Sequence, residues 1–133
     1  MKSDEQIMKE IEQAARGLLL MSEADYPFEP LHLEGTDAPS APLLRRLAGV
    51  PTEAPVETAD LGRLLRPSLL IEVRGDGTVP ASAQRAEDLL RALRENLSDV
   101  TAYRVGEINI AVYVLGRSPG GGWLGVSTRV VET

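Results

Sequence analysis

Residues able to do acid–base or cation-binding chemistry gather in one short segment near the N-terminus. Ser22, Glu23 and Asp25 stand close together there, and Tyr26 and Glu29 follow. Paired carboxylates can serve general acid–base catalysis or bind a hard cation. The segment lacks the Asp-x-Asp-x-Asp-Gly spacing of a calcium loop, which disfavours a calcium site. A binding surface for a cationic group and an ordinary solvated loop both remain open.

The sequence shows no residue set typical of an enzyme or of a resident metal site. Its single histidine is His32, and it contains no cysteine. Nucleophilic catalysis needs a nucleophile, a base and a group that orients the base, and His32 has no obvious partner for this. Zinc sites need several nitrogen or sulfur ligands. We therefore expect neither an enzyme nor a cofactor of the protein's own.

Length and charge narrow the class of protein further. The chain has 133 residues, of which 43% are hydrophobic, which predicts one domain, 1–133, with an aliphatic core. A formal net charge of −6 disfavours direct binding of nucleic acid or anionic membrane and favours cationic partners. The first residues lack the apolar run of a signal peptide, and no stretch has the roughly 20 apolar residues of a membrane span. We expect a soluble, cytoplasmic protein.

Helices are predicted where apolar residues recur every three or four positions. Their expected ranges are 3–17, 41–49, 59–66 and 83–97. The first begins with a capping box of Ser3 and Gln6, and its spacing continues to Leu18, although Gly17 could mark its end. Ser40 and Thr58 are the expected caps of the two short helices.

Strands are predicted at 28–33, near 69–74 and throughout the last third of the chain. Two sets of apolar residues alternate in the central stretch, namely Ile108, Ile110, Val112 and Val114 on one face and Ala111, Tyr113 and Leu115 on the other. This indicates a strand covered on both sides. Gly106 is expected to divide the stretch into two strands. The fold class is therefore α+β, with helices on a mainly antiparallel sheet that ends in a β-meander.

Two segments resemble the nuclease A inhibitor family, small acidic bacterial proteins that block a DNA/RNA non-specific nuclease. They are GLLLMSEADYPFE, residues 17–29, and YRVGEINIAVYVLGRSPGGGWLGVSTRVVET, residues 103–133. Their order and their distances from the chain ends are those of the family. The middle, about 33–79, carries no recognisable family pattern, and Trp123 stands where a smaller residue is expected.

The resemblance implies an α/β/α sandwich and a mechanism of inhibition. It implies that Glu23 approaches cationic groups in the nuclease active site and that the C-terminal Thr133 reaches the catalytic magnesium, which belongs to the nuclease. The residues expected to bind the partner are Ser22, Glu23, Asp25, Tyr26, Glu132 and Thr133. The free inhibitor is expected to be a monomer. The strand pattern runs almost to Thr133, whereas most domains leave their last residues untied.

Two other functions remain open from the sequence. A small acidic interaction module of the secretion-chaperone type would dimerise and expose apolar patches for a client. An enzyme or small-ligand binder would need a deep polar pocket that holds Glu23 and Asp25.

Overall fold

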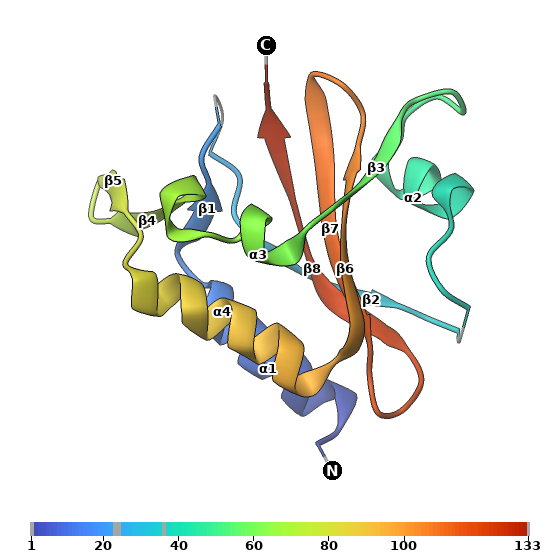
Figure 1. The fold of residues 1–133 in the computed structure, drawn as a ribbon, viewed down its shortest axis with the longest axis horizontal. Helices are drawn as coiled ribbons and strands as arrows, with labels where there is room; N and C mark the ends of the chain where they lie inside the picture. Colours follow the sequence, from blue (N-terminus) through green and yellow to red (C-terminus); the bar gives the residue numbers. More distant parts are fainter. Residues whose placement is uncertain (1, 23–24, 36, 133) are drawn as a thin grey trace.

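An antiparallel sheet forms the middle layer of the protein (Figure 1). The computed structural model describes residues 2–22, 25–35 and 37–132. Neighbouring strands of this main sheet follow the order β2-β8-β7-β6-β3. They are β2 (Glu29–Leu33), β8 (Trp123–Val131), β7 (Asn109–Arg117), β6 (Ser98–Val105) and β3 (Val56–Ala59). Strands β6, β7 and β8 form the predicted C-terminal meander.

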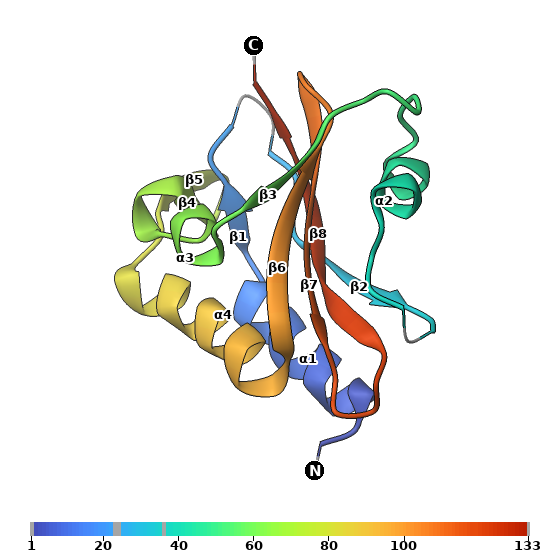
Figure 2. The same ribbon diagram turned by 45° about the vertical axis from the view of Figure 1, so that its right-hand side comes forward.

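Helices cover both faces of the main sheet, which confirms the α/β/α sandwich (Figure 2). One face carries α1 (Asp4–Ala15), α3 (Leu61–Leu64), the 3-10 helix η1 (Pro67–Leu69) and α4 (Ala83–Asn96), and the other carries α2 (Ala41–Ala48). A smaller antiparallel sheet lies beside the first group and contains β1 (Leu18–Leu20), β4 (Leu70–Arg74) and β5 (Gly77–Pro80). The apolar core is accordingly divided into two clusters, one on each side of the main sheet.

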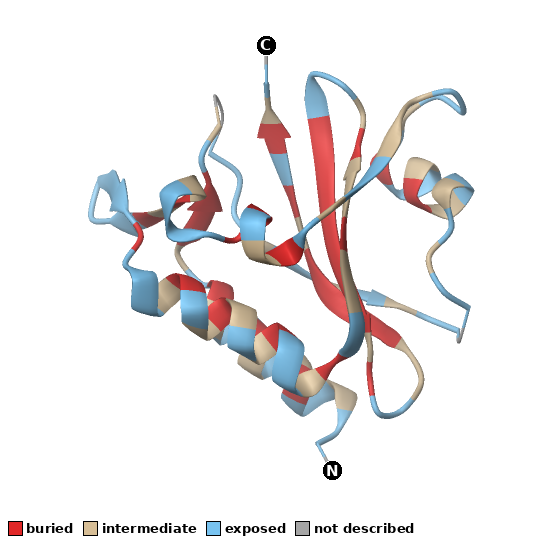
Figure 3. Cartoon of the chain, viewed as in Figure 1, coloured by how far each residue is buried: buried red, intermediate tan, exposed pale blue. Residues whose placement is uncertain are grey.

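Strand β7 contributes to both clusters, as its doubly apolar pattern predicts (Figure 3). Ile110, Val112 and Val114 belong to the cluster under α1 and α4, and Ala111, Tyr113 and Leu115 belong to the cluster under α2. The prediction is wrong for Ile108, whose exposed fraction is 56%. The reason is the expected break at Gly106, which has a φ of 110° and begins a turn, so that β7 starts only at Asn109.

The capping box at the start of α1 is confirmed. The Ser3 backbone N–H donates to Gln6 Oε1 at 2.9 Å, and the Gln6 backbone N–H donates to Ser3 Oγ at 3.2 Å. The expected cap of the third helix is wrong. Thr58 lies in β3, where its backbone pairs with β6, and Asp60 caps α3 by accepting a backbone N–H of the first turn at 3.0 Å.

The expected helical position of Leu18 is also wrong. Helix α1 ends at Ala15, and Gly17 follows with a φ of 79°, a left-handed conformation that glycine adopts without strain. Leu18 then begins β1, where it pairs with Glu72 of β4. Leu18 therefore belongs to a strand although its spacing is helical. The sequence could not show this, because the pairing partner lies far along the chain.

Candidate functional site

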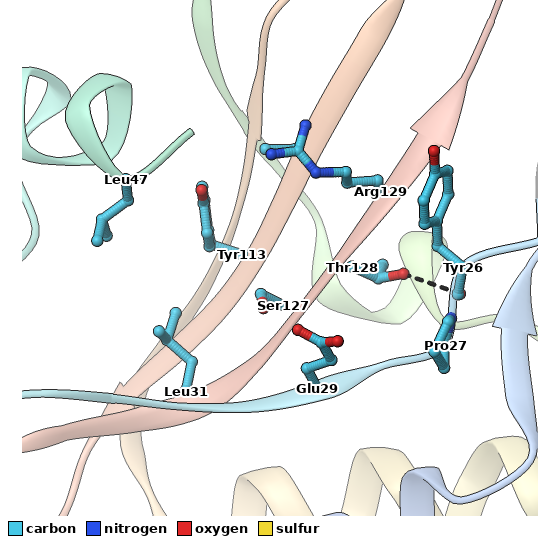
Figure 4. A pocket seen from close by; sticks show the side chains of 10 residues that line it. Tyr26, Pro27, Glu29, Leu31, Leu47, Tyr113, Ser127, Thr128 and Arg129 are labelled. Atoms are coloured by element: carbon cyan, nitrogen blue, oxygen red, sulfur yellow. Dashed lines mark hydrogen bonds between the residues drawn. The ribbon is translucent and has the colours of Figure 1, made fainter. Parts of the chain in front are cut away.

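The acidic loop comprises residues 21–28, and its described segment 25–28 lies beside β8 near the C-terminal end of that strand. Thr128 of β8 donates a hydrogen bond from Oγ1 to the backbone oxygen of Tyr26 at 3.1 Å (Figure 4). In both ribbon views the described part of the loop and the C-terminal end of β8 lie next to each other. Two segments that are distant in sequence, and that are both expected to bind the partner, are thus brought together.

Further contacts hold the acidic loop at its two ends. The Met21 backbone N–H donates to the Leu69 oxygen at 2.8 Å, and Pro27 forms an isolated antiparallel bridge with Leu19. The half-buried Phe28 packs against the cluster under α1 and α4. These contacts hold the described ends of the loop, at Met21 and at residues 27–28, against the rest of the protein.

The described residues of the expected site vary in exposure. Asp25 and Glu29 are exposed, Ser22 is half-buried, and the Tyr26 side chain has an exposed fraction of 42%. Glu29 begins the edge strand β2, where it pairs with Ser127. The loop therefore presents carboxylate and phenol groups to solvent.

Glu23 and Thr133, the two residues to which the resemblance assigns the main contacts, lie outside the described residues. Their described neighbours are Ser22 and Asp25 on the loop and Glu132 after β8. The expected roles of Glu23 and Thr133 remain predictions.

Glu132 has partners within the protein. The Arg104 guanidinium Nη2 lies 2.8 Å from Glu132 Oε1, and the Glu132 backbone N–H donates to the Ile108 oxygen at 2.9 Å. Arg104 could not be recognised from the sequence, because no local pattern in β6 indicates which carboxylate would reach it. The contacts fix the residue that precedes Thr133.

The β4–β5 hairpin extends the site on the other side of the acidic loop. A groove of about 410 Å³ separates the hairpin from the loop, and Asp25, Pro27, Val73 and Asp76 are among its lining residues. Asp76 lies in the Gly-Asp-Gly turn that joins β4 to β5, a sequence typical of tight turns. Two acidic residues from separate segments therefore share one groove.

A buried carboxylate at the base of this hairpin is paired with two arginines. Glu72 of β4 has an exposed fraction of 5%, and its carboxylate lies 2.5 Å from Arg74 Nε and 3.4 Å from Arg85 Nη1. A buried carboxylate with two guanidinium partners is compensated rather than available for chemistry. We assign Glu72 a structural role.

A second cavity, also of about 410 Å³, lies on the α2 face of the sheet (Figure 4). Glu29, Tyr113 and Arg129 contribute its polar side chains together with Ser127 and Thr128, and Leu31 and Leu47 contribute apolar ones. Burial raises the pKa of the Tyr113 hydroxyl, and the Arg129 charge opposes this shift. Asp25 is not among its described lining residues, so the cavity is not the pocket that the enzyme alternative requires.

Within residues 2–22, 25–35 and 37–132, no group of three or more His, Cys, Asp or Glu side chains is placed to hold a metal ion. No helix in the same ranges is both long and apolar enough to cross a membrane.

The fold and this end of the molecule define a small acidic α+β protein whose acidic loop and C-terminal strand are held side by side. Residues 5–133 match the family model described as nuclease A inhibitor-like protein, so the chain belongs to this family. The match includes the middle of the chain, where no family pattern is recognisable by eye. No curated protein matches the chain. Family membership indicates a nuclease inhibitor with a nuclease as partner, and it does not favour an enzyme or a secretion chaperone.

Proposed function

We propose that this protein inhibits a magnesium-dependent, sugar-non-specific endonuclease by occluding its active site with the acidic loop and the C-terminal threonine. The observation that carries the proposal is the hydrogen bond from Thr128 Oγ1 to the Tyr26 oxygen, since it sets the loop beside the end of β8. Family membership supports the class of partner. The inhibitor would act in the bacterial cytoplasm and would be monomeric when free.

The chemistry follows from what such a nuclease binds. Its active site holds a metal ion and basic side chains that stabilise the negative oxygens of a phosphodiester. Glu23 and Asp25 offer carboxylates to the basic side chains. Thr133 would offer its hydroxyl and, if its terminus is free, a carboxylate as well, and magnesium prefers such oxygen ligands. The inhibitor thus imitates the charge of the substrate without a bond that the nuclease can cut.

The net charge of −6 supports the same partner, because a protein that binds nucleic acid presents a basic surface. Attraction between the two surfaces would accelerate association. The inhibitor itself would not bind the nucleic acid, since both are anionic.

A titration tests the proposal. The purified protein is added in increasing amounts to a magnesium-dependent non-specific nuclease from the source cell, and the cleavage of DNA and of RNA is followed. We expect both activities to be lost at a fixed molar ratio. Full activity at micromolar excess of the protein would overturn the proposal.

A further inference from the structure

An ion pair spans β7 at the end of the main sheet that carries the C-terminus. Arg104 belongs to β6 and Glu132 follows β8, and 28 residues separate them in sequence. Because β7 lies between β6 and β8, the two side chains meet over the neighbouring strand. Their atoms Nη2 and Oε1 are 2.8 Å apart, a normal length for a charge-assisted hydrogen bond.

The backbone contributes a second contact at the same point. The regular pairing of β8 with β7 ends where Val131 faces Asn109. The Glu132 N–H then donates to the Ile108 oxygen at 2.9 Å, which extends the pairing by one residue. Glu132 is therefore held through its main chain and its carboxylate, directly before Thr133.

Two glutamates, Glu57 and Glu132, lie near Arg104. Glu57 of β3 lies directly opposite Arg104 in the sheet, and such cross-strand neighbours point to the same face. Among the described residues, the ion pair of Arg104 is with Glu132. The Arg104 side chain has an exposed fraction of 26% against 54% for Glu132, so the cation is the more sheltered partner and fixes the more exposed one.

We propose that Arg104 is a positioning residue: it holds Glu132, the residue that leads to Thr133, in place before the nuclease binds. This inference rests on the proposed function. Terminal residues that lack such ties fray, and ordering them upon binding reduces the affinity. The Arg104–Glu132 pair orders the residue before Thr133 in the free protein, so less ordering remains when the complex forms.

In this role Glu132 supports Thr133, whereas the resemblance implies that Glu132 contacts the partner itself. If the Glu132 carboxylate bound the nuclease directly, loss of the Arg104 charge would make the surface more acidic and would favour a basic partner. In the positioning role the two residues act as a unit. Removal of either charge then weakens inhibition, although the two changes alter the net charge in opposite directions.

The experiment compares Arg104→Gln, Glu132→Gln and the double variant with wild-type protein. Glu57→Gln is the matched control, because it removes a carboxylate that faces Arg104 from the other side. We expect each single variant to raise the inhibition constant about two- to fivefold, as the strength of a partly exposed ion pair would imply. The inhibition constant of the double variant should equal that of the single variants, and that of Glu57→Gln should equal that of wild type. Arg104→Lys keeps the charge and should inhibit better than Arg104→Gln.

A measurement without nuclease tests the positioning role of Arg104 separately from the proposed inhibition. The steady-state ¹⁵N heteronuclear NOE of the Glu132 amide in the free protein should fall in Arg104→Gln and stay unchanged in Glu57→Gln. An unchanged NOE in Arg104→Gln, or inhibition that is equal to wild type or tighter, would overturn the positioning role. A wild-type protein that fails to inhibit would overturn the proposed function, while the NOE would still decide whether Arg104 orders Glu132. Melting curves of every variant exclude loss of the fold as the cause.

Discussion

Thr128 and Tyr26 are joined by a 3.1 Å hydrogen bond although 102 residues separate them in sequence. Thr128 is a residue of β8 with an exposed fraction of 6%, and Tyr26 belongs to the acidic loop. The donor is a side chain held by the sheet, and the acceptor is the main chain of the loop. The bond therefore sets the position of the loop relative to the strand that leads to Thr133.

Thr128→Val tests this relationship, because valine keeps the branched shape and removes the hydroxyl. We expect the free energy of unfolding to fall by about 1 kcal/mol, as for the loss of a partly buried hydrogen bond. Inhibition should also weaken, since the hydrogen bond that holds the loop next to β8 is lost. Chemical denaturation and nuclease titration measure the two effects. Thr128→Ser keeps the hydroxyl and should inhibit like wild type; if it inhibits no better than Thr128→Val, the hydrogen bond is not responsible.

Local patterns in the sequence were sufficient for much of the fold. The capping box of Ser3 and Gln6 depends on residues within one turn, and the alternation in β7 depends on nearest neighbours. The short strand β1 escaped prediction because its first residue, Leu18, continues the helical spacing of the preceding segment. Strand β3 escaped because it lies in a proline-interrupted connector and is defined by its pairing with β6.

The candidate site likewise combines features that the local sequence predicts with features that depend on long-range contacts. The acidic residues of the loop can be recognised in the sequence, since their side-chain types are sufficient. Their anchoring by Thr128 and the pairing of Arg104 with Glu132 depend on contacts across the sheet, and local spacing carries no signal for such contacts. Asp76 joins the site only because the β4–β5 hairpin folds next to the loop.

Gly125 is required for the close pairing of β8 with β7. A Cβ atom at this position would lie 1.7 Å from the Val114 backbone oxygen, and that atom cannot move without disturbing the strand. We expect Gly125→Ala to lower the free energy of unfolding by about 3 kcal/mol or more, the upper range for overpacked sites. Thermal or urea unfolding measures this effect. Gly77→Ala is the control, because a Cβ there meets nothing within 4 Å, and equal stability of the two variants would contradict the steric account.

Glu23→Gln removes one carboxylate from the acidic loop. If this carboxylate binds a desolvated cation of the nuclease, its loss should weaken binding by about 2–5 kcal/mol. The melting temperature should barely change. Calorimetry or inhibition kinetics gives the change in affinity, and Glu34→Gln, which removes an exposed carboxylate just after the far end of β2, serves as the charge-matched control. An unchanged dissociation constant would show that Glu23 takes no part in binding.

Salt should slow the formation of the complex. The inhibitor carries a net charge of −6, so attraction to a basic nuclease increases the association rate at low ionic strength. At about 0.15 M salt the Debye length is about 8 Å, which screens this attraction over longer distances. Stopped-flow measurements across a range of salt concentrations test the effect. Association rates that do not change with salt would mean that the charge serves solubility rather than recognition.

The C-terminus gives the most direct test of the proposed mechanism. A tag attached after Thr133 should weaken inhibition severely, because the site that accepts the hydroxyl and carboxylate leaves no room for further residues, whereas the same tag at Met1 should be harmless. Deletion of Thr133 should have the same effect as the C-terminal tag and should preserve stability, because the contacts of Glu132 with Arg104 and Ile108 remain. Deletion of Glu132 as well would remove those contacts and confuse the two effects.

The metal dependence of this effect identifies what Thr133 binds. A terminal amide replaces one carboxylate oxygen and removes the negative charge, so it should weaken binding to the magnesium-loaded nuclease and leave binding to the metal-free nuclease about the same. Titration calorimetry with both forms of the nuclease measures the difference. If the end of β8 only completes the sheet, the changes at Thr133 should reduce stability, and their effect on binding should not depend on magnesium. Equal inhibition by the tagged and untagged proteins would leave the acidic loop as the part of the inhibitor that blocks the active site.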